Sequence, residues 1–458
     1  MSLLINKKKY SSLHFVGILG SGMSAIAQYL TWSSVQVSGS DRLINTETTK
    51  YIQDTLESIG CRIYKQDGSG IMADTEGLVL STAIEDSNPD IAKARRNNIP
   101  VFHRSDVLAA IVNTKKTIAV AGTSGKSTVA ALTFHLLSSC GKKPSLISGG
   151  NLNELVERGF IGNAYHDTSD LLVIEADESD GSLVKYKPYI SIFLNLSKDH
   201  KPVTETLQLF HSLAKQSSHV FCNYDDRSLR SIQPTQTFGL NNKADLFPDT
   251  TELHDTSSSL ILGKDTFTTP FPGKYSLYNL LAALTICKFL DCDSNSLSKS
   301  SETYKGIQRR FNCYKTAKGV TIIDDYAHNP EKINAILETV QNISPVIYAL
   351  FQPHGFAPTR FLLPELIEVF KNRLRESDVL YLLPIYYAGG TVNKDISSMD
   401  IAEGLHPGRG EVITPGHRDD VISHIASRAK PGDIVISMGA RDPSLPEFAR
   451  SIAAAIDK

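Results

Sequence analysis

One pattern of strand, loop and helix constrains the fold of this chain more than any other feature. The stretch TIAVAGTSGKSTVAALTFHLL begins at Thr117 and places a glycine-rich turn between an apolar strand and a helix. Small residues in such a turn let the backbone approach a phosphate, while the amides and the helix N-terminus supply positive potential. Lys126 adds a full charge, and Ser127 offers a hydroxyl to magnesium. A glycine turn with an incidental lysine is the structural alternative, but these flanks favour a site for a nucleoside triphosphate.

The loop is a short variant of the usual phosphate-binding pattern. The strict pattern would place a glycine where this chain has Val120. The remaining small residues and the lysine still follow the strand directly. We therefore expect the loop to contact ATP through Gly122, Thr123, Ser124, Gly125, Lys126, Ser127 and Thr128.

The length of the chain indicates three domains. A chain of 458 residues is too long for one ordinary domain, and roughly 150 residues per domain is the usual expectation. Strand-like apolar runs alternate with helical patterns, which favours parallel sheets covered by helices. New strand-opened segments begin with LHFVGIL, near Thr117 and near Cys313. We expect an α/β fold with domains at residues 1–112, 113–312 and 313–458.

Composition narrows the class of protein. The formal net charge is -2, whereas nucleic-acid and membrane partners usually demand a basic face, so neither is expected. No apolar run approaches the roughly 18 residues that span a bilayer. The six cysteines form no CxxC pair, which favours reduced, structural thiols in a cytoplasmic protein.

Acidic residues follow the run LLVI at the end of an expected strand. Glu175, Asp177, Glu178 and Asp180 lie within six residues and would repel one another without a cation. Mg²⁺ is the natural partner beside a phosphate loop, because hard cations prefer carboxylate oxygens. A solvated acidic loop is the alternative.

The pair Asp199-His200 ends the next expected strand, ISIFLNLSKDH. A neutral imidazole there is suited to a second metal or to the substrate, with a neighbouring group fixing its tautomer. Because this strand end shares a sheet edge with the phosphate loop, we favour a functional histidine over a structural one. The expected metal ligands are Ser127, Glu175 and His200.

The first segment carries a second glycine motif. Gly20-Ser-Gly22-Met-Ser-Ala25 follows a strand, and Asp41 closes the next strand about 20 residues later. This pattern is typical of dinucleotide sites, but any nucleotide diphosphate can use the same glycines and helix N-terminus. A triphosphate loop in the next segment makes a redox enzyme less favoured.

At this point the motifs resemble a known family, the Mur ligases. The segments GILGSGMSAIA, GSD, STAIEDSNPDI, IPVFHRSDVLAAI, AGTSGKST, EADESD, GKYSLYNLLAAL, GIQRRF, DDYAHNP and FQPHGFAPTR occur in a similar order over essentially the whole chain. The amino-terminal motifs are most similar to the alanine-adding branch and its relative, murein peptide ligase. The resemblance implies a Rossmann-like UDP-binding domain, a central ATPase domain and a Rossmann-like C-terminal domain for the amino-group donor.

The resemblance also implies roles for particular residues. The UDP-substrate site would comprise Gly20, Ser21, Gly22, Met23, Asp41, Ser81, His103 and Arg104. Lys126 would hold the β- and γ-phosphates, Ser127 and Glu175 magnesium, and His200 a second metal. Adenine, phosphate and ribose contacts would come from Asn279, Arg310 and Asp325, and a phosphate or acyl contact from His328. Donor contacts would come from His354 and Arg360, and the catalytic set would be Lys126, Glu175, His200 and His328.

Several positions depart from the alanine-adding pattern. Ser124 replaces the usual histidine, Lys201 a common methionine, and DDYAHNP resembles the later, tripeptide-building ligases. In the loop after FQPH only Arg360 is left of the arginines that hold the donor carboxylate, which puts the donor in question. Lys215 lies near the spacing of a lysine that some members carbamylate, with an ordinary surface lysine as the favoured alternative.

The resemblance implies an ATP-dependent ligase of peptidoglycan synthesis. The expected substrates are UDP-N-acetylmuramic acid and an amino acid, L-alanine first, joined through an acyl phosphate with ATP and one or two Mg²⁺ ions. A monomer or a homodimer is expected. The alternatives are a murein peptide ligase that takes a recycled tripeptide, a NAD-dependent oxidoreductase fused to an ATPase module, and a catalytically silent nucleotide-binding relative.

Overall fold

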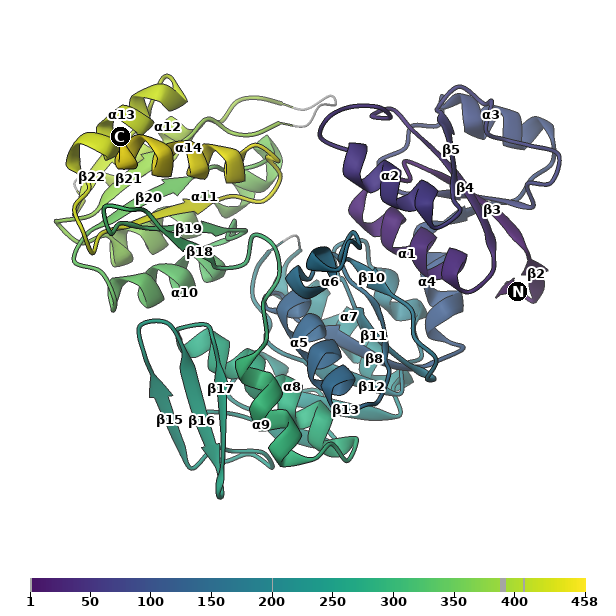
Figure 1. Cartoon of the computed structure of the whole chain (residues 1–458), viewed down its shortest axis with the longest axis horizontal. Coiled ribbons are helices and arrows are strands. Elements are labelled where there is room, and N and C mark those ends of the chain that lie inside the picture. Colours follow the sequence, from purple (N-terminus) through teal and green to yellow (C-terminus); the bar gives the residue numbers. More distant parts are fainter. Residues whose placement is uncertain (1, 200, 388–392, 407) are drawn as a thin grey trace.

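The structure is a computed structural model that describes residues 2–199, 201–387, 393–406 and 408–458. It consists of three α/β domains, each built on its own sheet, as the sequence predicts (Figure 1). The predicted boundaries at residues 112 and 312 fall close to the end of one helix, α4 (Arg104–Val112), and the start of one strand, β18 (Asn312–Lys315).

The N-terminal domain is a parallel sheet of five strands in the order β5-β4-β3-β6-β7. All five residues of the strand predicted from LHFVGIL, β3, are buried, so its apolar run is explained by helices on both faces. A short hairpin of β1 and β2 precedes this sheet. The elements are β1 (Leu3–Ile5), β2 (Lys8–Tyr10), β3 (Ser12–Val16), α1 (Ser21–Trp32), β4 (Gln36–Asp41), α2 (Lys50–Ser58), β5 (Arg62–Lys65), β6 (Gly77–Leu80), α3 (Pro89–Arg96), β7 (Val101–His103) and α4.

The central domain has seven strands in the order β10-β9-β11-β8-β12-β13-β14, and a separate antiparallel sheet of β15, β16 and β17. Its main elements are β8 (Lys116–Ala121), α5 (Lys126–Ser139), β9 (Ser145–Ile147), α6 (Asn153–Glu157), β10 (Ala164–Tyr165), β11 (Leu171–Glu175), β12 (Ile190–Phe193), α7 (Val203–Gln216), β13 (His219–Asn223) and β14 (Gln236–Phe238). The later ones are β15 (Thr250–Leu253), β16 (Ser258–Leu262), β17 (Asp265–Thr269), α8 (Lys274–Phe289) and α9 (Ser294–Glu302). Strands β11 and β12 flank β8 on either side. The acidic run and Asp199 therefore emerge beside the phosphate loop, at the carboxyl edge of the sheet.

The C-terminal domain has six strands in the order β18-β19-β23-β20-β21-β22, with β18 antiparallel to β19. The last strand of the chain inserts between β19 and β20, so the middle of this sheet joins segments about a hundred residues apart. The elements after β18 are β19 (Thr321–Asp325), α10 (Pro330–Gln341), β20 (Ile347–Phe351), α11 (Phe356–Arg373), β21 (Val379–Leu382), α12 (Ser398–Leu405), β22 (Glu411–Ile413), α13 (Arg418–Arg428), β23 (Ile434–Met438) and α14 (Leu445–Asp457).

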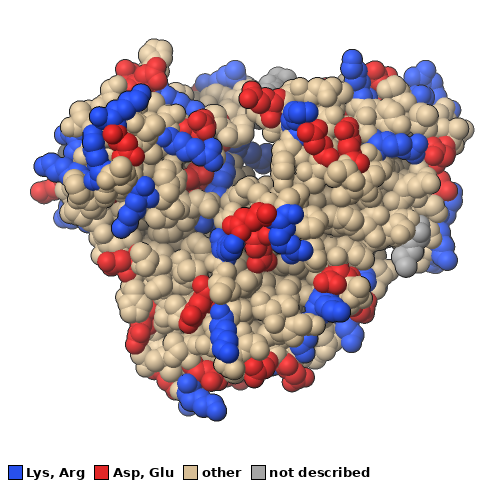
Figure 2. Space-filling view, in the orientation of Figure 1, with Lys and Arg blue, Asp and Glu red and all other residues tan. Residues whose placement is uncertain are grey.

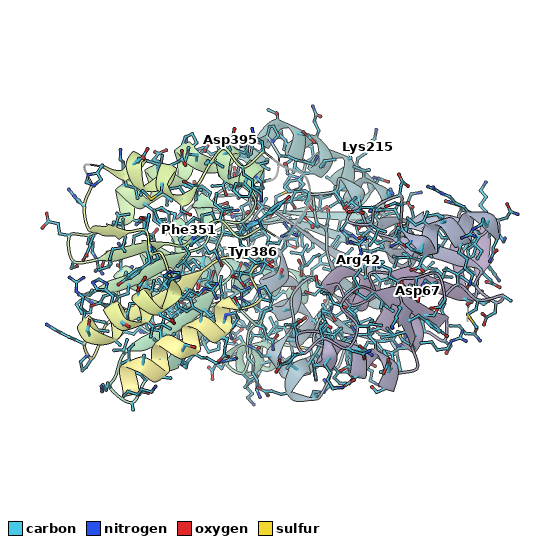
Figure 3. All side chains as sticks on the ribbon, turned by 90° about the horizontal axis from the view of Figure 1, so that it is seen from above. Arg42, Asp67, Lys215, Phe351, Tyr386 and Asp395 are labelled. Carbon is cyan, nitrogen blue, oxygen red and sulfur yellow. The ribbon has the colours of Figure 1, made fainter. Side chains whose placement is uncertain are left out.

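The three domains meet around the carboxyl edge of the central sheet. Acidic and basic side chains are interspersed over the face seen in Figure 2, and a hollow opens between the N- and C-terminal domains. The view from above in Figure 3 shows the N- and C-terminal domains at opposite ends of the molecule. Within the described residues, no helix is both long enough and apolar enough to cross a bilayer.

Candidate nucleotide and substrate site

The phosphate loop joins β8 to α5 with two glycines that no other residue replaces easily. Gly122 and Gly125 have φ of 148° and 86°, a backbone conformation that L side chains rarely adopt. A Cβ on Gly125 would also lie 2.7 Å from the side-chain oxygen of Asn279, on α8. The loop therefore lies close against the helix that carries Asn279.

Lys126, the first residue of α5, points back into this loop. Its Nζ donates hydrogen bonds to the carbonyl oxygen of Gly122 and to Oε2 of Glu178, each at 2.8 Å. Burial opposes the charge on Lys126, but the neighbouring carboxylates, Glu178 foremost, outweigh burial and raise its pKa. The other oxygen of Glu178 is buried and has no hydrogen-bond partner among the described residues. Sequence reasoning marked the acidic run but assigned its function to Glu175 and missed this ion pair.

Glu175, at the end of β11, is held by three donors. Its carboxylate accepts hydrogen bonds from Oγ of Ser127 at 2.9 Å, Oγ of Ser148 at 2.6 Å and the amide of Gly149 at 2.7 Å. Ser127 and Glu175 thus present a hydroxyl and a carboxylate at one point beside the phosphate loop. This hard-oxygen set fits Mg²⁺, which usually takes one or two carboxylates and completes its shell with phosphate and water. Among the described residues, no group of three or more His, Cys, Asp or Glu side chains is placed to hold a metal ion.

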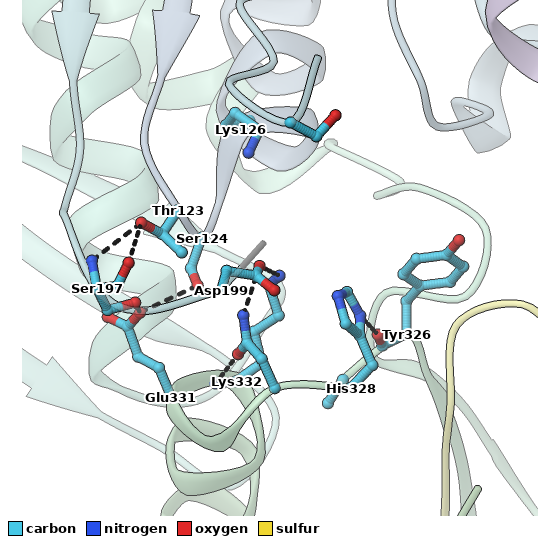
Figure 4. Close-up of polar contacts among 12 residues, drawn as sticks. Thr123, Ser124, Lys126, Ser197, Asp199, Tyr326, His328, Glu331 and Lys332 are labelled. Carbon is cyan, nitrogen blue, oxygen red and sulfur yellow. Dashed lines mark hydrogen bonds and ion pairs between the residues drawn. The ribbon is translucent and has the colours of Figure 1, made fainter. Parts of the chain in front are cut away.

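The first turn of α10 from the C-terminal domain lies against this edge (Figure 4). Asp199 accepts a hydrogen bond from Nδ2 of Asn329 at 2.8 Å and forms an ion pair with Nζ of Lys332 at 3.2 Å. Glu331 accepts hydrogen bonds from the hydroxyls of Ser124, at 3.3 Å, and Ser197. The predicted metal ligand His200 lies outside the described residues.

Lys332 is a cation that sequence reasoning missed. Burial lowers its pKa; Asp199 opposes that effect, and Lys126 and Arg310 add to it. Arg310 and Lys332 line the same cavity, and Lys126 is near enough to influence the pKa of Lys332. Its position could have indicated a functional role, because Lys332 is the second residue after the motif DDYAHNP.

A cavity of about 370 Å³ extends from the phosphate loop between α8 and the start of the C-terminal domain. Its wall includes the predicted Asn279, Arg310 and Asp325, together with Ser124, Gly125 and Thr128. The rings of Phe271, Tyr275 and Tyr304 form an apolar part of the wall. Asp325 accepts hydrogen bonds from the amides of Phe311 and Ala327 at 2.8 and 2.7 Å. The cavity combines polar groups for a ribose and phosphates with a flat apolar surface suited to a base.

The predicted UDP-site residues lie at several strand ends, loops and helix starts of the N-terminal domain. Gly20 to Met23 form the cap and first turn of α1, and a side chain on Gly22 would meet the Arg104 guanidinium at 3.2 Å. Arg104 pairs with Asp180 of the acidic run at 2.8 Å, which ties this turn to the central domain. Asp41 accepts the amides of Leu19 and Leu43, each at 3.0 Å. Ser81, after β6, is half-buried.

His103 caps the helix that begins at Arg104. Its side chain accepts a hydrogen bond from the amide of Ser105 at 3.3 Å, and Nε2 is buried with no hydrogen-bond partner in the part of the chain that the structure describes. Burial lowers the pKa of His103. The ring is therefore neutral near pH 7, with one nitrogen left for a ligand.

The residues expected to contact the donor do not all lie in one cavity. His328 and His354 face each other with ring centroids 5.1 Å apart and line a second cavity of about 260 Å³ together with Asp199. Burial lowers the pKa of His328 well below its usual value, and Lys332 adds to this effect. Arg360, by contrast, pairs with Asp395 and is not among the lining residues. The described residues that line this cavity include no lysine or arginine.

The predicted modification residue Lys215 lies apart from these groups. It occupies the last turn of α7 and is exposed. Figure 3 shows its side chain at the edge of the molecule. This position fits an ordinary surface lysine.

Comparison with known proteins gives the same family over all three domains. Residues 12–116 match the Mur ligase family catalytic domain, residues 120–287 the Mur ligase middle domain, and residues 309–441 the Mur ligase glutamate ligase domain. The UDP-N-acetylmuramate–L-alanine ligase of Geobacter sulfurreducens is 33% identical, over 94% of this chain and 95% of its own length. That of Pelotomaculum thermopropionicum is 30% identical, over 96% of each chain.

Solved structures show the same fold. The UDP-N-acetylmuramate-alanine ligase of Thermotoga maritima superposes with a TM-score of 0.75 at 23% identity, over 97% of this chain and 98% of its own. A murein peptide ligase of Psychrobacter arcticus gives 0.68 at 18% identity, over 98% and 99%. The three-domain arrangement is therefore common to enzymes with different donors.

Proposed function

The chain belongs to the Mur ligase family, and we propose that it is the ATP-dependent ligase that joins L-alanine to the carboxyl group of UDP-N-acetylmuramic acid. One observation carries this proposal. The acidic run after β11 contacts both Lys126, through Glu178, and Arg104 of the N-terminal domain, through Asp180. Lys332 of the C-terminal domain meets Asp199 on the neighbouring strand end. All three domains thus contribute charged groups to one edge, as a reaction of ATP with two further substrates requires.

ATP would occupy the cavity between the phosphate loop and α8. The base would lie among the aromatic rings near Asn279, and the ribose and phosphates near Asp325 and Arg310. The phosphates would reach Lys126, Ser127 and the loop amides. Because Glu178 pairs with Lys126, a phosphate bound there would compete with this carboxylate for the lysine.

Ser127 and Glu175 would hold a Mg²⁺ ion, and His200 a second one. Bound magnesium would neutralise charge on the phosphates during transfer. The three donors to Glu175 fix the direction of its carboxylate, so the residue is positioned before any ion arrives.

The acceptor would lie between the first two domains. Its diphosphate would meet the amides at the start of α1, from Gly20 to Met23, and the Arg104 guanidinium. Asp41, Ser81 and His103 would complete the site toward the uridine. The acceptor carboxylate would then point toward the phosphate loop.

The reaction would proceed in two steps at this edge. The acceptor carboxylate attacks the γ-phosphorus of ATP. ADP is released, and the acceptor remains bound as an acyl phosphate. Lys126, Arg310 and Lys332 would balance the charge on the transferred group, since phosphoryl transfer depends on alignment and electrostatic stabilisation. The amine then attacks the acyl carbon and phosphate leaves.

The donor amine would enter by the cavity of His328 and His354. His328 would contact a phosphate or the acyl group from the wall of this cavity. The described lining includes no lysine or arginine, so other groups would have to bind the donor carboxylate. The volume suits a small amino acid, and the enzyme would act in the cytoplasm.

Phosphate release from ATP tests this proposal directly. The full chain is mixed with Mg²⁺, UDP-N-acetylmuramic acid and either L-alanine, another single amino acid or the wall tripeptide. Release that requires both the UDP-sugar and L-alanine is expected. Release with the tripeptide alone would identify a murein peptide ligase instead, and no release with any donor would refute the ligase proposal.

A further inference from the structure

Three of the six cysteines meet at one place in the central domain, away from the proposed active site. Cys140 follows α5, Cys287 lies in the last turn of α8, and Cys292 lies just beyond that helix. Cys287 and Cys292 belong to one buried core, and Cys140 packs against it. Nothing in the proposed reaction uses these thiols.

The end of α8 brings two of the thiols together. The amide of Cys292 bonds to the carbonyl of Cys287 at 3.0 Å, and that of Asp291 to the carbonyl of Lys288 at 3.1 Å. Asp291 has φ of 53°. These two bonds around a left-handed residue are a Schellman motif, which folds the chain back so that its last residue contacts the final helical turn. Cys292 therefore lies against Cys287.

The end of α5 has the same geometry and supplies the third thiol. The amide of Lys142 bonds to the carbonyl of Leu137, and that of Gly141 to the carbonyl of Ser138, each at 2.9 Å. Gly141 has φ of 72°, so the helix stops at Cys140. Cys287 and Cys140 both lie near enough to Cys292 to influence the pKa of its thiol. The two helix ends thus place three thiols in one region of the core.

The contacts make the thiols chemically unequal. The hydrogen bond from Cys287 is the main cause that lowers the pKa of Cys292 to about 7, and Cys140 and Lys142 assist. Burial is the main cause that raises the pKa of Cys140 to about 12. Cys287 is fully buried, Cys292 is 9% exposed and Cys140 is half-buried. Cys292 is the thiolate of the group, and the thiolate is the form that reacts with oxidants.

We propose that Cys292 and Cys140 are a modification site at which hydrogen peroxide oxidises the two thiols to a reversible disulfide. The sulfur of Cys292 attacks the peroxide oxygen, which gives a sulfenic acid and releases hydroxide. The sulfur of Cys140 then attacks the Cys292 sulfur, which forms the S–S bond and releases water after proton transfer. The two thiols lose two electrons and the peroxide gains them. Cys287 remains a thiol that donates its hydrogen bond.

This site would link the two helices that build the nucleotide cavity. The N-terminal end of α5 carries the phosphate loop, and the N-terminal half of α8 carries Asn279. The disulfide would join their opposite ends, so it would fix the helices to each other without touching the cavity. Oxidation of these thiols does not depend on the proposed ligase activity.

Peptide mapping of the full chain tests it. The reduced protein is treated with hydrogen peroxide at pH 7, quenched with iodoacetamide and digested without reductant. We expect a cross-linked pair of peptides that contain Cys140 and Cys292, reversed by dithiothreitol. Cys313 is the internal control, because it is exposed and its pKa is raised by burial of part of the thiol. Cys292 should react at least about threefold faster, since a larger thiolate fraction outweighs its lower nucleophilicity.

Three variants separate the roles. Cys140→Ser should abolish the cross-link and leave a sulfenic acid on Cys292 that dimedone traps. Cys292→Ser should remove both, and Cys313→Ser should change neither. Reaction of Cys313 before Cys292, or a sulfenic acid on Cys140 in Cys292→Ser, would overturn the proposal. Thermal melting under reductant checks folding, and the order of reaction in the unaltered protein decides the matter even if a variant fails to fold.

Discussion

The central domain meets its two neighbours by very different contacts. The junction with the N-terminal domain belongs to one continuous apolar core, and aromatic pairs such as Trp32 with Phe160 cross it. A buried pair of neutral side chains also crosses it, since Gln28 donates to the side-chain oxygen of Asn163 at 2.8 Å, and the Arg104–Asp180 ion pair lies at its edge. Such contacts exclude water and lose much if the two domains separate.

The junction with the C-terminal domain is instead made largely of charges beside the phosphate loop. Lys332 pairs with Asp199, Glu331 with two serines, and Lys198 with Glu365 at 2.6 Å. Apolar contact there is narrower, with Phe271 and Tyr275 packed on the core of the C-terminal domain. The first junction therefore holds two domains together largely through a shared apolar core, whereas the second places charged side chains of both domains beside the phosphate loop.

Lys126→Ala should give the largest effect, because it removes the cation of the phosphate loop that both junctions surround. We expect the rate of phosphate release to fall by at least about 10³-fold, from lost stabilisation of the transferred group. Lys299→Ala, an exposed lysine of the same domain, is the control. Near-normal turnover of the Lys126 variant would contradict the proposed reaction.

Lys332→Met tests whether the charged junction contributes to catalysis. We expect kcat to fall by about 10- to 100-fold with little change in the KM for ATP, since the cation would act mainly on the transition state. Lys371→Met, exposed on α11, is the matched control. A change in melting temperature with unchanged kcat would show that Lys332 only joins the domains.

Acid should lower the free energy of unfolding through His14, a buried residue of the N-terminal domain. Burial lowers its pKa to about 4 from an ordinary 6.5, so the folded state favours the neutral ring. The stabilisation is complete above pH 6.5 and is lost as pH falls toward 4, and it amounts to about 3 kcal/mol. Urea unfolding of His14→Gln should show a flatter pH dependence between these values. His254→Gln, an exposed control, should keep the original slope.

Asn163→Ala tests the cohesion of the first junction. It leaves one N–H of the Gln28 amide unpaired, because Nε2 keeps only the carbonyl of Ser24, and it removes the hydrogen bond that Asn163 donates to the hydroxyl of Ser24. We expect the free energy of unfolding to fall by about 1–3 kcal/mol, because unpaired buried polar groups are costly. Asn295→Ala, on the exposed side of α9, should stay within about 0.5 kcal/mol of the parent in the same denaturant series. An unchanged unfolding midpoint for Asn163→Ala would remove the distinction between the junctions.

Lys215→Ala should give the smallest effect. Its side chain is exposed, so we expect unchanged phosphate release at saturating Mg²⁺. A large loss of activity that short carboxylic acids restore would show instead that this lysine carries a carbamate at the active edge. Lys201→Ala, near the start of the same helix, provides the comparison.

The local elements were predictable because short segments encode them. The phosphate loop combines the residues that a strand-loop-helix unit needs, so its place between β8 and α5 followed from the sequence. The buried strands β3, β8 and β19 likewise showed as apolar runs, because parallel strands are covered on both faces. The predicted phosphate, adenine and ribose contacts are roles that the cavity now supports as proposals.

The remaining contacts depend on segments that are far apart in the chain. No local pattern shows that β23 inserts beside β19, that Lys332 reaches Asp199, or that Glu178 rather than Glu175 pairs with Lys126. The same holds for Cys140 and Cys292, which are brought together by two separate helix ends. The sequence by itself determined three α/β domains, a phosphate loop and a set of candidate residues, since these rest on local periodicity and backbone conformation. Only the tertiary structure decided which charges face each other, because ion pairs across domains depend on how whole sheets pack.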